Sequence, residues 1–149
     1  MKRRSLLTVL AALPLLQTRL VHAAAAQIHV YKDPACGCCT AWVDHLKAAG
    51  FEVKVTESGD ASSIRKRLGM PDRFAGCHTA TSGNYVIEGH VPAVEIKRLL
   101  ATKPQAIGLA VPGMPMGSLG MEYGDRRDPY KVLLIDRGGK DTVFASYPA

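Results

Sequence analysis

The sequence lacks the features of a large, membrane-embedded or nucleic-acid-binding protein. Its 149 residues provide one sizeable hydrophobic core and little more. Of the formal net charge of +6, four positive charges lie in the first 23 residues, which contain no acidic residue, so the remainder carries only +2. No internal repeat, charge block or low-complexity tract follows residue 26. These absences exclude a large multidomain enzyme and predict no nucleic-acid partner.

The N-terminus has the pattern of an export signal. Three basic residues at positions 2–4 precede an apolar stretch, Leu6 to Leu16, and a run of small residues. We predict a cleaved signal peptide over residues 1–23, with the cleavage site between 23 and 26, and a single domain over residues 24–149. The apolar stretch is shorter than the roughly 20 residues that cross a bilayer, so no membrane span is expected after cleavage. Because Arg3-Arg4 also resembles a twin-arginine signal, the predicted location is the periplasm, by the Sec or the twin-arginine route.

The hydrophobic periodicity of the remaining chain predicts one α/β (α+β) domain. Its order of elements, βαβαββα, is the thioredoxin-like arrangement around a mixed sheet, followed by a loop rich in glycine, proline and methionine and then by a C-terminal β-hairpin. The predicted strands are Gln27 to Lys32, Phe51 to Val55, Cys77 to Thr81 and Tyr85 to Glu88. The predicted helices are Cys39 to Ala49, a short one after Asp60 or Ser62, and Pro92 to Leu100. The loop is Gln105 to Asp128, and the hairpin pairs Val132 to Ile135 with Thr142 to Tyr147.

Three thiols within four residues are the strongest chemical feature. Cys36, Cys38 and Cys39 lie where the first strand meets the N-terminus of the first helix. Unpaired N–H groups and partial positive charge at that end favour thiolate over thiol, and thiolate is both the nucleophile and the metal ligand. Cys36 and Cys39 have the spacing of a redox pair and are expected to form a disulfide in the oxidised protein. Cys38 is surplus to that pair and favours a metal site.

The fourth cysteine, Cys77, is followed by His78. In a thioredoxin-like topology the third strand begins beside the first helix, so both residues are expected close to the three-cysteine turn. Neighbours on an extended strand point to opposite faces, so the two would bind one ion together only at a bend or bulge. A cluster of several ions would relax that restriction. Soft thiolates select Cu(I) or zinc, and Cu(I) can cycle with Cu(II).

Further soft or nitrogen donors are weaker candidates. Methionine thioethers suit a soft metal and keep their binding ability in an oxidising compartment, but methionine also fills gaps under loops. For the isolated histidines outside the Cys77-His78 pair, a structural role is favoured over ligation. The weaker candidates are Met114, Met116 and Met121 in the long loop, His90 before Val91-Pro92, and then His45 and His29.

At these residues the sequence resembles the CopG-like family of small exported copper- and cation-resistance proteins, once catalogued as a domain of unknown function. The resemblance runs from about Val30 to Glu122. It implies a periplasmic, thioredoxin-like protein that binds copper through its cysteines and is redox active. The motifs that carry it are Tyr31-Lys32-Asp33-Pro34-x-Cys36-Gly37-Cys38-Cys39, Cys77-His78-Thr79-Ala80, Tyr85-Val86-Ile87-Glu88-Gly89-His90-Val91-Pro92, Gly108-Leu109-Ala110-Val111-Pro112-Gly113-Met114-Pro115 and Gly120-Met121-Glu122.

We therefore predict a periplasmic copper-resistance protein rather than a conventional enzyme. Its metal ligands would be Cys36, Cys38, Cys39, Cys77 and His78, and its partners would be copper ions and a periplasmic copper chaperone or efflux component. Two other hypotheses remain open: a thiol-disulfide oxidoreductase that uses Cys36 and Cys39, and a module stabilised by zinc. Purely structural disulfides are disfavoured, because such closely spaced cysteines are poor links between distant parts of a fold.

Overall fold

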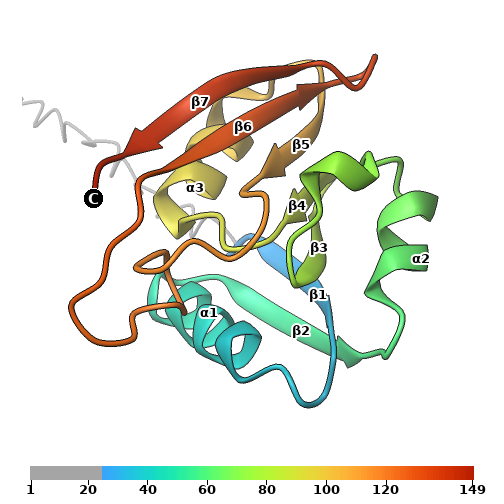
Figure 1. Cartoon of the computed structure of the whole chain (residues 1–149). Coiled ribbons are helices and arrows are strands. Elements are labelled where there is room, and N and C mark those ends of the chain that lie inside the picture. The colour runs from blue at the N-terminus through green and yellow to red at the C-terminus, as the bar shows by residue number, and fades with distance from the viewer. Residues whose placement is uncertain (1–24) are drawn as a thin grey trace, which may run out of the picture.

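The computed structural model describes residues 25–149, so the predicted signal peptide lies outside the described residues. Strands and helices alternate in the first half of this region, and strands dominate the second half (Figure 1). The elements are β1 (Gln27–Lys32), α1 (Gly37–Ala48), β2 (Glu52–Glu57), α2 (Ala61–Arg67), a 3-10 turn η1 (Asp72–Phe74), β3 (His78–Ser82), β4 (Tyr85–Glu88), α3 (Ala93–Thr102), β5 (Ala106–Ala110), β6 (Tyr130–Asp136) and β7 (Asp141–Tyr147).

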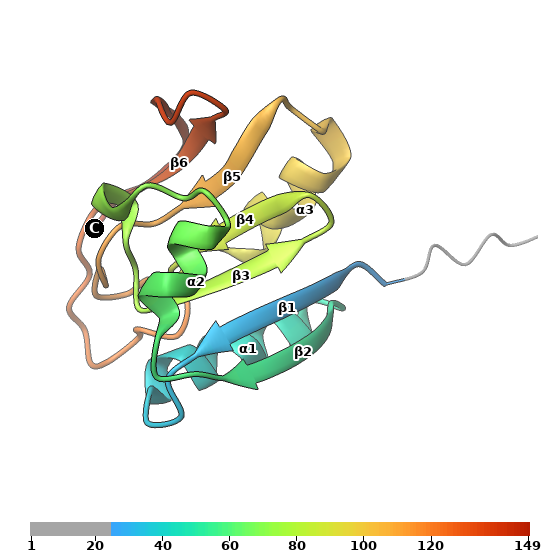
Figure 2. The same cartoon turned by 90° about the vertical axis from the view of Figure 1, so that its right-hand side faces the viewer.

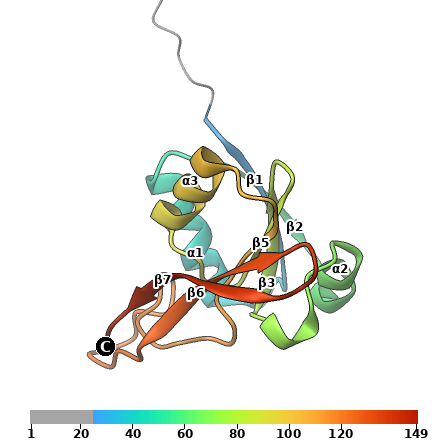
Figure 3. The ribbon, with the colours of Figure 1, turned by 90° about the horizontal axis from the view of Figure 1, so that it is seen from above.

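All seven described strands form one mixed sheet in the order β2-β1-β3-β4-β5-β6-β7. The pairs β1·β2 and β4·β5 are parallel and the other neighbours are antiparallel. Helix α2 covers one face, while α1 and α3 cover the other (Figures 2 and 3). The predicted α+β class and the order βαβαββα are confirmed, and the assignment to the thioredoxin-like class stays a prediction.

The main core lies between the sheet and the helices α1 and α3. Strand β1 contributes Ile28 and Val30, both fully buried, because its apolar residues alternate with polar ones. Helix α1 contributes Trp42 and Leu46, which lie one turn apart on the same face. The Trp42 indole N–H donates to the carbonyl of Val91 at 2.9 Å, which satisfies the one polar atom of this buried ring. This core fixes α1 against the sheet and so positions the turn at its N-terminus.

The ends of the helices carry residues that are common at caps. Asp60 caps α2 by accepting a hydrogen bond from the backbone N–H of Ser63 at 3.0 Å. Gly50 follows α1 with a φ of +89°, the left-handed conformation that glycine adopts most readily. Pro92 caps α3, and Pro104 lies just beyond its end. No helix within residues 25–149 is both long enough and apolar enough to span a membrane.

The predicted loop from Gln105 to Asp128 is wrong at its start. Residues Ala106–Ala110 form β5, which pairs with β4 on one side and β6 on the other. Its small residues carry little strand signal, but Gly108 permits a close approach of two backbones: a Cβ there would lie 1.7 Å from the carbonyl oxygen of Val86. The irregular segment is therefore shorter, residues 111–129, and is called the covering loop below. The C-terminal hairpin is confirmed, with both strands longer than predicted.

Replacing Gly108 with alanine tests this close approach. In Gly108→Ala the added methyl group meets the backbone of β4, which cannot move aside as a flexible side chain would. We expect the free energy of unfolding to fall by about 2 kcal/mol or more. Urea denaturation of the chain from Ala24 onward measures the change.

Gly59→Ala is the matched control, because no atom lies within 4 Å of the position that its added methyl group would take, and its backbone is not left-handed. Equal stability of the two variants would contradict the arrangement of β4 and β5.

Candidate metal centre

The three-cysteine turn is built by the start of α1. Cys36 is the N-cap of α1, and its Sγ accepts a hydrogen bond from the backbone N–H of Cys39 at 3.3 Å. Cys38 and Cys39 lie in the first helical turn, where their side chains stay close to the cap. The expected disulfide between Cys36 and Cys39 is confirmed, and Cys38 and Cys77 are free thiols.

Strand pairing brings Cys77 to this turn. In the antiparallel pair β1·β3, His78 lies opposite Lys32, so the residue before β3 faces the residues that follow β1 (Figure 2). The Cys77 Sγ lies 3.5 Å from that of Cys39 and 3.8 Å from that of Cys38. All four sulfurs lie within 4.8 Å of one another. The predicted convergence of the four cysteines is therefore present in the structure.

Two histidines adjoin Cys77 and form a second group with it. The Cys77 Sγ lies 3.0 Å from His90 Nε2 and 3.4 Å from His78 Nδ1, and these three ligand atoms also lie within 4.8 Å of one another. Cys77 is thus common to a four-sulfur group and to a sulfur-imidazole group. We expected Cys77 and His78 to bind one ion together only at a bend or bulge, and Cys77 lies in a bend just before β3, where the alternation of a regular strand does not apply.

His90, a weaker candidate in the sequence, lies inside the centre. The register of the β3·β4 hairpin pairs Thr79 with Glu88, and continuing that register places residue 90 opposite residue 77. The hydrogen bond from the Gly89 N–H to the His78 carbonyl at 3.0 Å extends the hairpin in this direction. The signal was therefore available in the sequence: the predicted hairpin alone, extended by two residues, identifies His90 as the neighbour of Cys77.

The covering loop determines which ring nitrogen of His90 carries the proton. A carbonyl can only accept, so the contact of 2.8 Å between His90 Nδ1 and the Leu119 carbonyl places the ring proton on Nδ1. The lone pair of the neutral ring is then on Nε2, which faces Cys77. A ligating histidine is commonly oriented in this way through its other nitrogen. The next residue, Gly120, packs so tightly on α1 that a Cβ there would lie 2.7 Å from the Cys38 carbonyl oxygen.

Burial controls the charge of the donor groups. His78 is fully buried, and this burial, helped by the neighbouring His90, lowers the pKa of His78 to about 3. Burial also lowers the pKa of His90. Both rings are therefore neutral at pH 7, the form that binds metal. Burial, together with Cys38, raises the pKa of the Cys77 thiol to about 12, so this proton is held in the metal-free protein and must leave when a metal binds.

The Nε2 of His78 is a buried polar atom without a hydrogen-bond partner in the described part of the chain. An atom of this kind is uncommon in a folded protein and often marks a functional position. The ring packs against Trp42, with ring centroids 4.2 Å apart, and edge-on against His90 at 5.0 Å. The imidazole is thus held in place by two neighbouring rings, while its Nε2 atom makes no hydrogen bond within the described residues.

A buried carboxylate supports the segment that carries Cys77. Glu88 is fully buried and accepts hydrogen bonds from the Gly76 backbone N–H at 2.8 Å and the Thr79 hydroxyl at 2.7 Å. The guanidinium of Arg65 lies 3.5 Å from the same carboxylate, and Arg65 also pairs with Asp72. Burial raises the pKa of Glu88, while these hydrogen bonds and Arg65 act in the opposite direction. Sequence reasoning missed Glu88, because a glutamate in a strand more often faces solvent.

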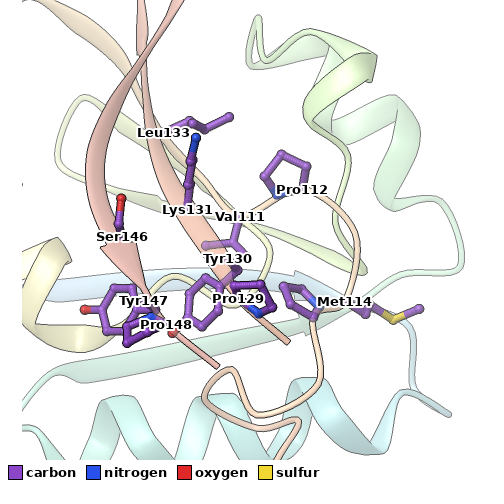
Figure 4. Close-up of a pocket in the computed structure, with 11 residues that line it drawn as sticks. Val111, Pro112, Met114, Pro129, Tyr130, Lys131, Leu133, Ser146, Tyr147 and Pro148 are labelled. Atoms are coloured by element: carbon purple, nitrogen blue, oxygen red, sulfur yellow. The ribbon is translucent and has the colours of Figure 1, made fainter. Parts of the chain in front are cut away.

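The remaining candidates lie around the centre or away from it. Met114 is 55% exposed and lines a groove of about 910 Å³ between the covering loop and the β6–β7 hairpin (Figure 4). No cysteine is among the residues that line this groove. Met116 and Met121 are partly buried in the covering loop, so ligation by the three methionines stays a prediction. The weakest two candidates have other partners: His45 pairs with Glu122 at 3.1 Å, and His29 contacts the hydroxyls of Thr56 and Tyr31.

The fold and the cluster together define a small α+β protein whose thiol and imidazole donors suit a soft metal ion. Two solved structures named copper resistance protein CopG, form 2 and form 1, are 44% identical to the chain, with TM-scores of 0.80. They cover 83% and 84% of this chain, and 99% of each of those chains is covered. The family described as a protein of unknown function, DUF411, matches residues 74–121. No curated protein matches. The chain belongs to the CopG family of copper resistance proteins.

The role of Glu88 in placing Cys77 predicts two linked effects of Glu88→Gln. The substitution keeps the shape of the side chain but weakens the buried hydrogen bonds to Gly76 and Thr79. It also leaves Arg65 with Asp72 as its one acidic partner within the described residues. We therefore expect the free energy of unfolding to fall by about 2 kcal/mol. The segment before β3 should also loosen, and alkylation of Cys77 by iodoacetamide should accelerate. Urea denaturation and peptide mass spectrometry measure the two effects.

Glu57→Gln, at the exposed end of β2, is the control and should change neither quantity. An unaltered alkylation rate in Glu88→Gln would show that Glu88 does not position Cys77.

Proposed function

We propose that this protein binds copper in the periplasm and serves copper resistance or homeostasis by holding Cu(I) at Cys36, Cys38, Cys39, Cys77 and His78, with His90 as a further ligand. The observation that carries the proposal is the position of Cys77 within 4.8 Å of three other sulfurs and of two neutral imidazoles. Thiolates are soft ligands that favour Cu(I), and imidazole also suits copper. The names of the two similar structures point to the same metal.

The two groups that share Cys77 favour more than one copper ion. Reduction of the Cys36–Cys39 disulfide would supply four thiols, and a sulfur that belongs to both groups can bridge two ions. Because the same donors include two neutral imidazoles, the set can accommodate either oxidation state of copper. We therefore extend the proposal to a multinuclear site that cycles copper between Cu(I) and Cu(II).

The cellular setting follows from the N-terminal pattern. Positions 2–4 are basic and an apolar stretch follows, which supports export by the Sec or the twin-arginine route to the periplasm. A periplasmic copper chaperone or an efflux component would then deliver or receive the ion. Cys36, Cys38 and Cys77 are each partly exposed residues, which supports access by such a partner.

A thiol-disulfide oxidoreductase is the second candidate, and the disulfide at the N-terminus of α1 is the observation that favours it. Such an enzyme would need Cys36 and Cys39 alone, so its exchange activity would survive Cys38→Ser and Cys77→Ser. A zinc-stabilised module is the third, since zinc takes the same donors. Zinc removal would then unfold the chain.

The copper proposal predicts a loss of affinity in Cys77→Ser. The reduced chain from Ala24 onward is loaded with Cu(I) under anaerobic conditions and titrated with bicinchoninate, a competing chelator. Because Cys77 belongs to both groups of ligands, its replacement should lower the affinity for Cu(I) at least about tenfold.

His29→Gln removes a histidine outside the centre and should leave the affinity unchanged. The proposal fails if bicinchoninate removes Cu(I) from the unsubstituted protein as readily as it does from Cys77→Ser.

A further inference from the structure

The disulfide and the two free thiols are packed against each other. The Sγ of Cys38 lies 3.4 Å from that of Cys36, and the Sγ of Cys77 lies 3.5 Å from that of Cys39. The free pair, Cys38 and Cys77, is 3.8 Å apart. The whole sequence contains four cysteines, and all of them are in this cluster. The number of cysteines is therefore even, and each can form a disulfide with another cysteine of the same molecule.

The free pair is placed to form a second disulfide. A bond of about 2.05 Å requires the two sulfurs to approach by a little under 2 Å from their separation of 3.8 Å, which rotation of the two side chains can share. Cys77 lies before the first residue of β3, so the alternation of a regular strand does not fix the direction of its side chain. Pairing Cys77 with Cys39, or Cys38 with Cys36, would instead require the existing disulfide to break.

We propose that the four thiols reduce cupric ions in two successive two-electron steps, the first forming the Cys36–Cys39 disulfide and the second a Cys38–Cys77 disulfide. The inference rests on the proposed function, because it names the source of the electrons for the copper held at this site. In each step two S–H bonds break and one S–S bond forms. The two electrons convert two Cu(II) ions into two Cu(I) ions, and the two protons pass to solvent.

The two steps have different consequences for the metal. After the first step, Cys38, Cys77, His78 and His90 remain as donors, and Cu(I) stays bound. After the second step every cysteine is in a disulfide, and of the donors in the cysteine-histidine cluster only the imidazoles remain. Since Cu(I) prefers sulfur ligands, the second step releases it. Excess Cu(II) thus oxidises the site to a state that gives up the reduced ion.

The order of the steps follows from the structure. The Cys36–Cys39 disulfide is already closed, while Cys38 and Cys77 are still thiols. The structure therefore has the disulfide state expected after the first step and before the second. The Cys36 and Cys39 pair belongs to one turn of backbone, so it closes with little movement, whereas the second pair joins α1 to the segment before β3.

An anaerobic titration tests the proposal. The fully reduced chain from Ala24 onward, which contains the whole described fold, is mixed with cupric sulfate in excess. Bathocuproine disulfonate then measures the Cu(I) formed, and thiol titration in denaturant counts the thiols that remain. We expect four Cu(I) and no remaining thiol per chain, with a peptide that joins Cys38 to Cys77 in non-reducing digests. Cys38→Ser and Cys77→Ser should each halve the yield to two Cu(I) and keep one thiol.

A second readout follows the release. Copper that stays with the protein through a desalting column should fall at least about tenfold between the one-disulfide and the two-disulfide forms. His29→Gln is the control and should behave as the unsubstituted chain in both measurements.

Three outcomes would overturn the inference: a yield that stops at two Cu(I) with two thiols left, a second disulfide between chains, or one that joins Cys39 to Cys77. None of the three contradicts the proposed function, which depends on a separate result, the binding of Cu(I) by the reduced protein. Failure of the reduced protein to bind Cu(I) at all would instead remove the proposed function.

Discussion

The centre depends on the antiparallel pairing of β3 with both of its neighbours. Pairing with β1 places Cys77 beside the turn that carries Cys36, Cys38 and Cys39, and pairing with β4 places His90 on the other side of Cys77. A shift of one residue in either register would move these side chains to the opposite face of the sheet. The fold therefore specifies the donor set through backbone hydrogen bonds rather than through contacts among the donors themselves.

Burial then determines what the donor set can do. His78 and His90 are neutral because the protein excludes water from them, and Leu119 of the covering loop fixes the proton of His90 on the nitrogen that faces away from Cys77. Glu88 satisfies the backbone beneath Cys77 without contributing a ligand. The structure thus separates the atoms that can bind a metal from the atoms that hold them in place, an arrangement typical of metal sites.

Much of the centre could be predicted from the sequence. The hydrophobic alternation of Ile28 and Val30 and the helical spacing of Trp42 and Leu46 are strong local signals, and they place the cysteine turn between β1 and α1. Strand β5 was missed because Ala106–Ala110 has small residues and depends on its neighbours for stability. The inward orientation of His78 depends on where β3 begins, and the role of Glu88 depends on its burial. The local sequence pattern determines neither the start of the strand nor the burial.

Copper-edge X-ray absorption of the reduced, copper-loaded protein tests most directly whether the four sulfurs act together on the metal. The account predicts several sulfur neighbours at bonding distance from copper, with their number reduced both in Cys77→Ser and in Cys38→Ser, because strand β3 and the turn before α1 contribute to one site. A first shell of nitrogen and oxygen alone, or a sulfur count that Cys77→Ser leaves unchanged, would contradict it.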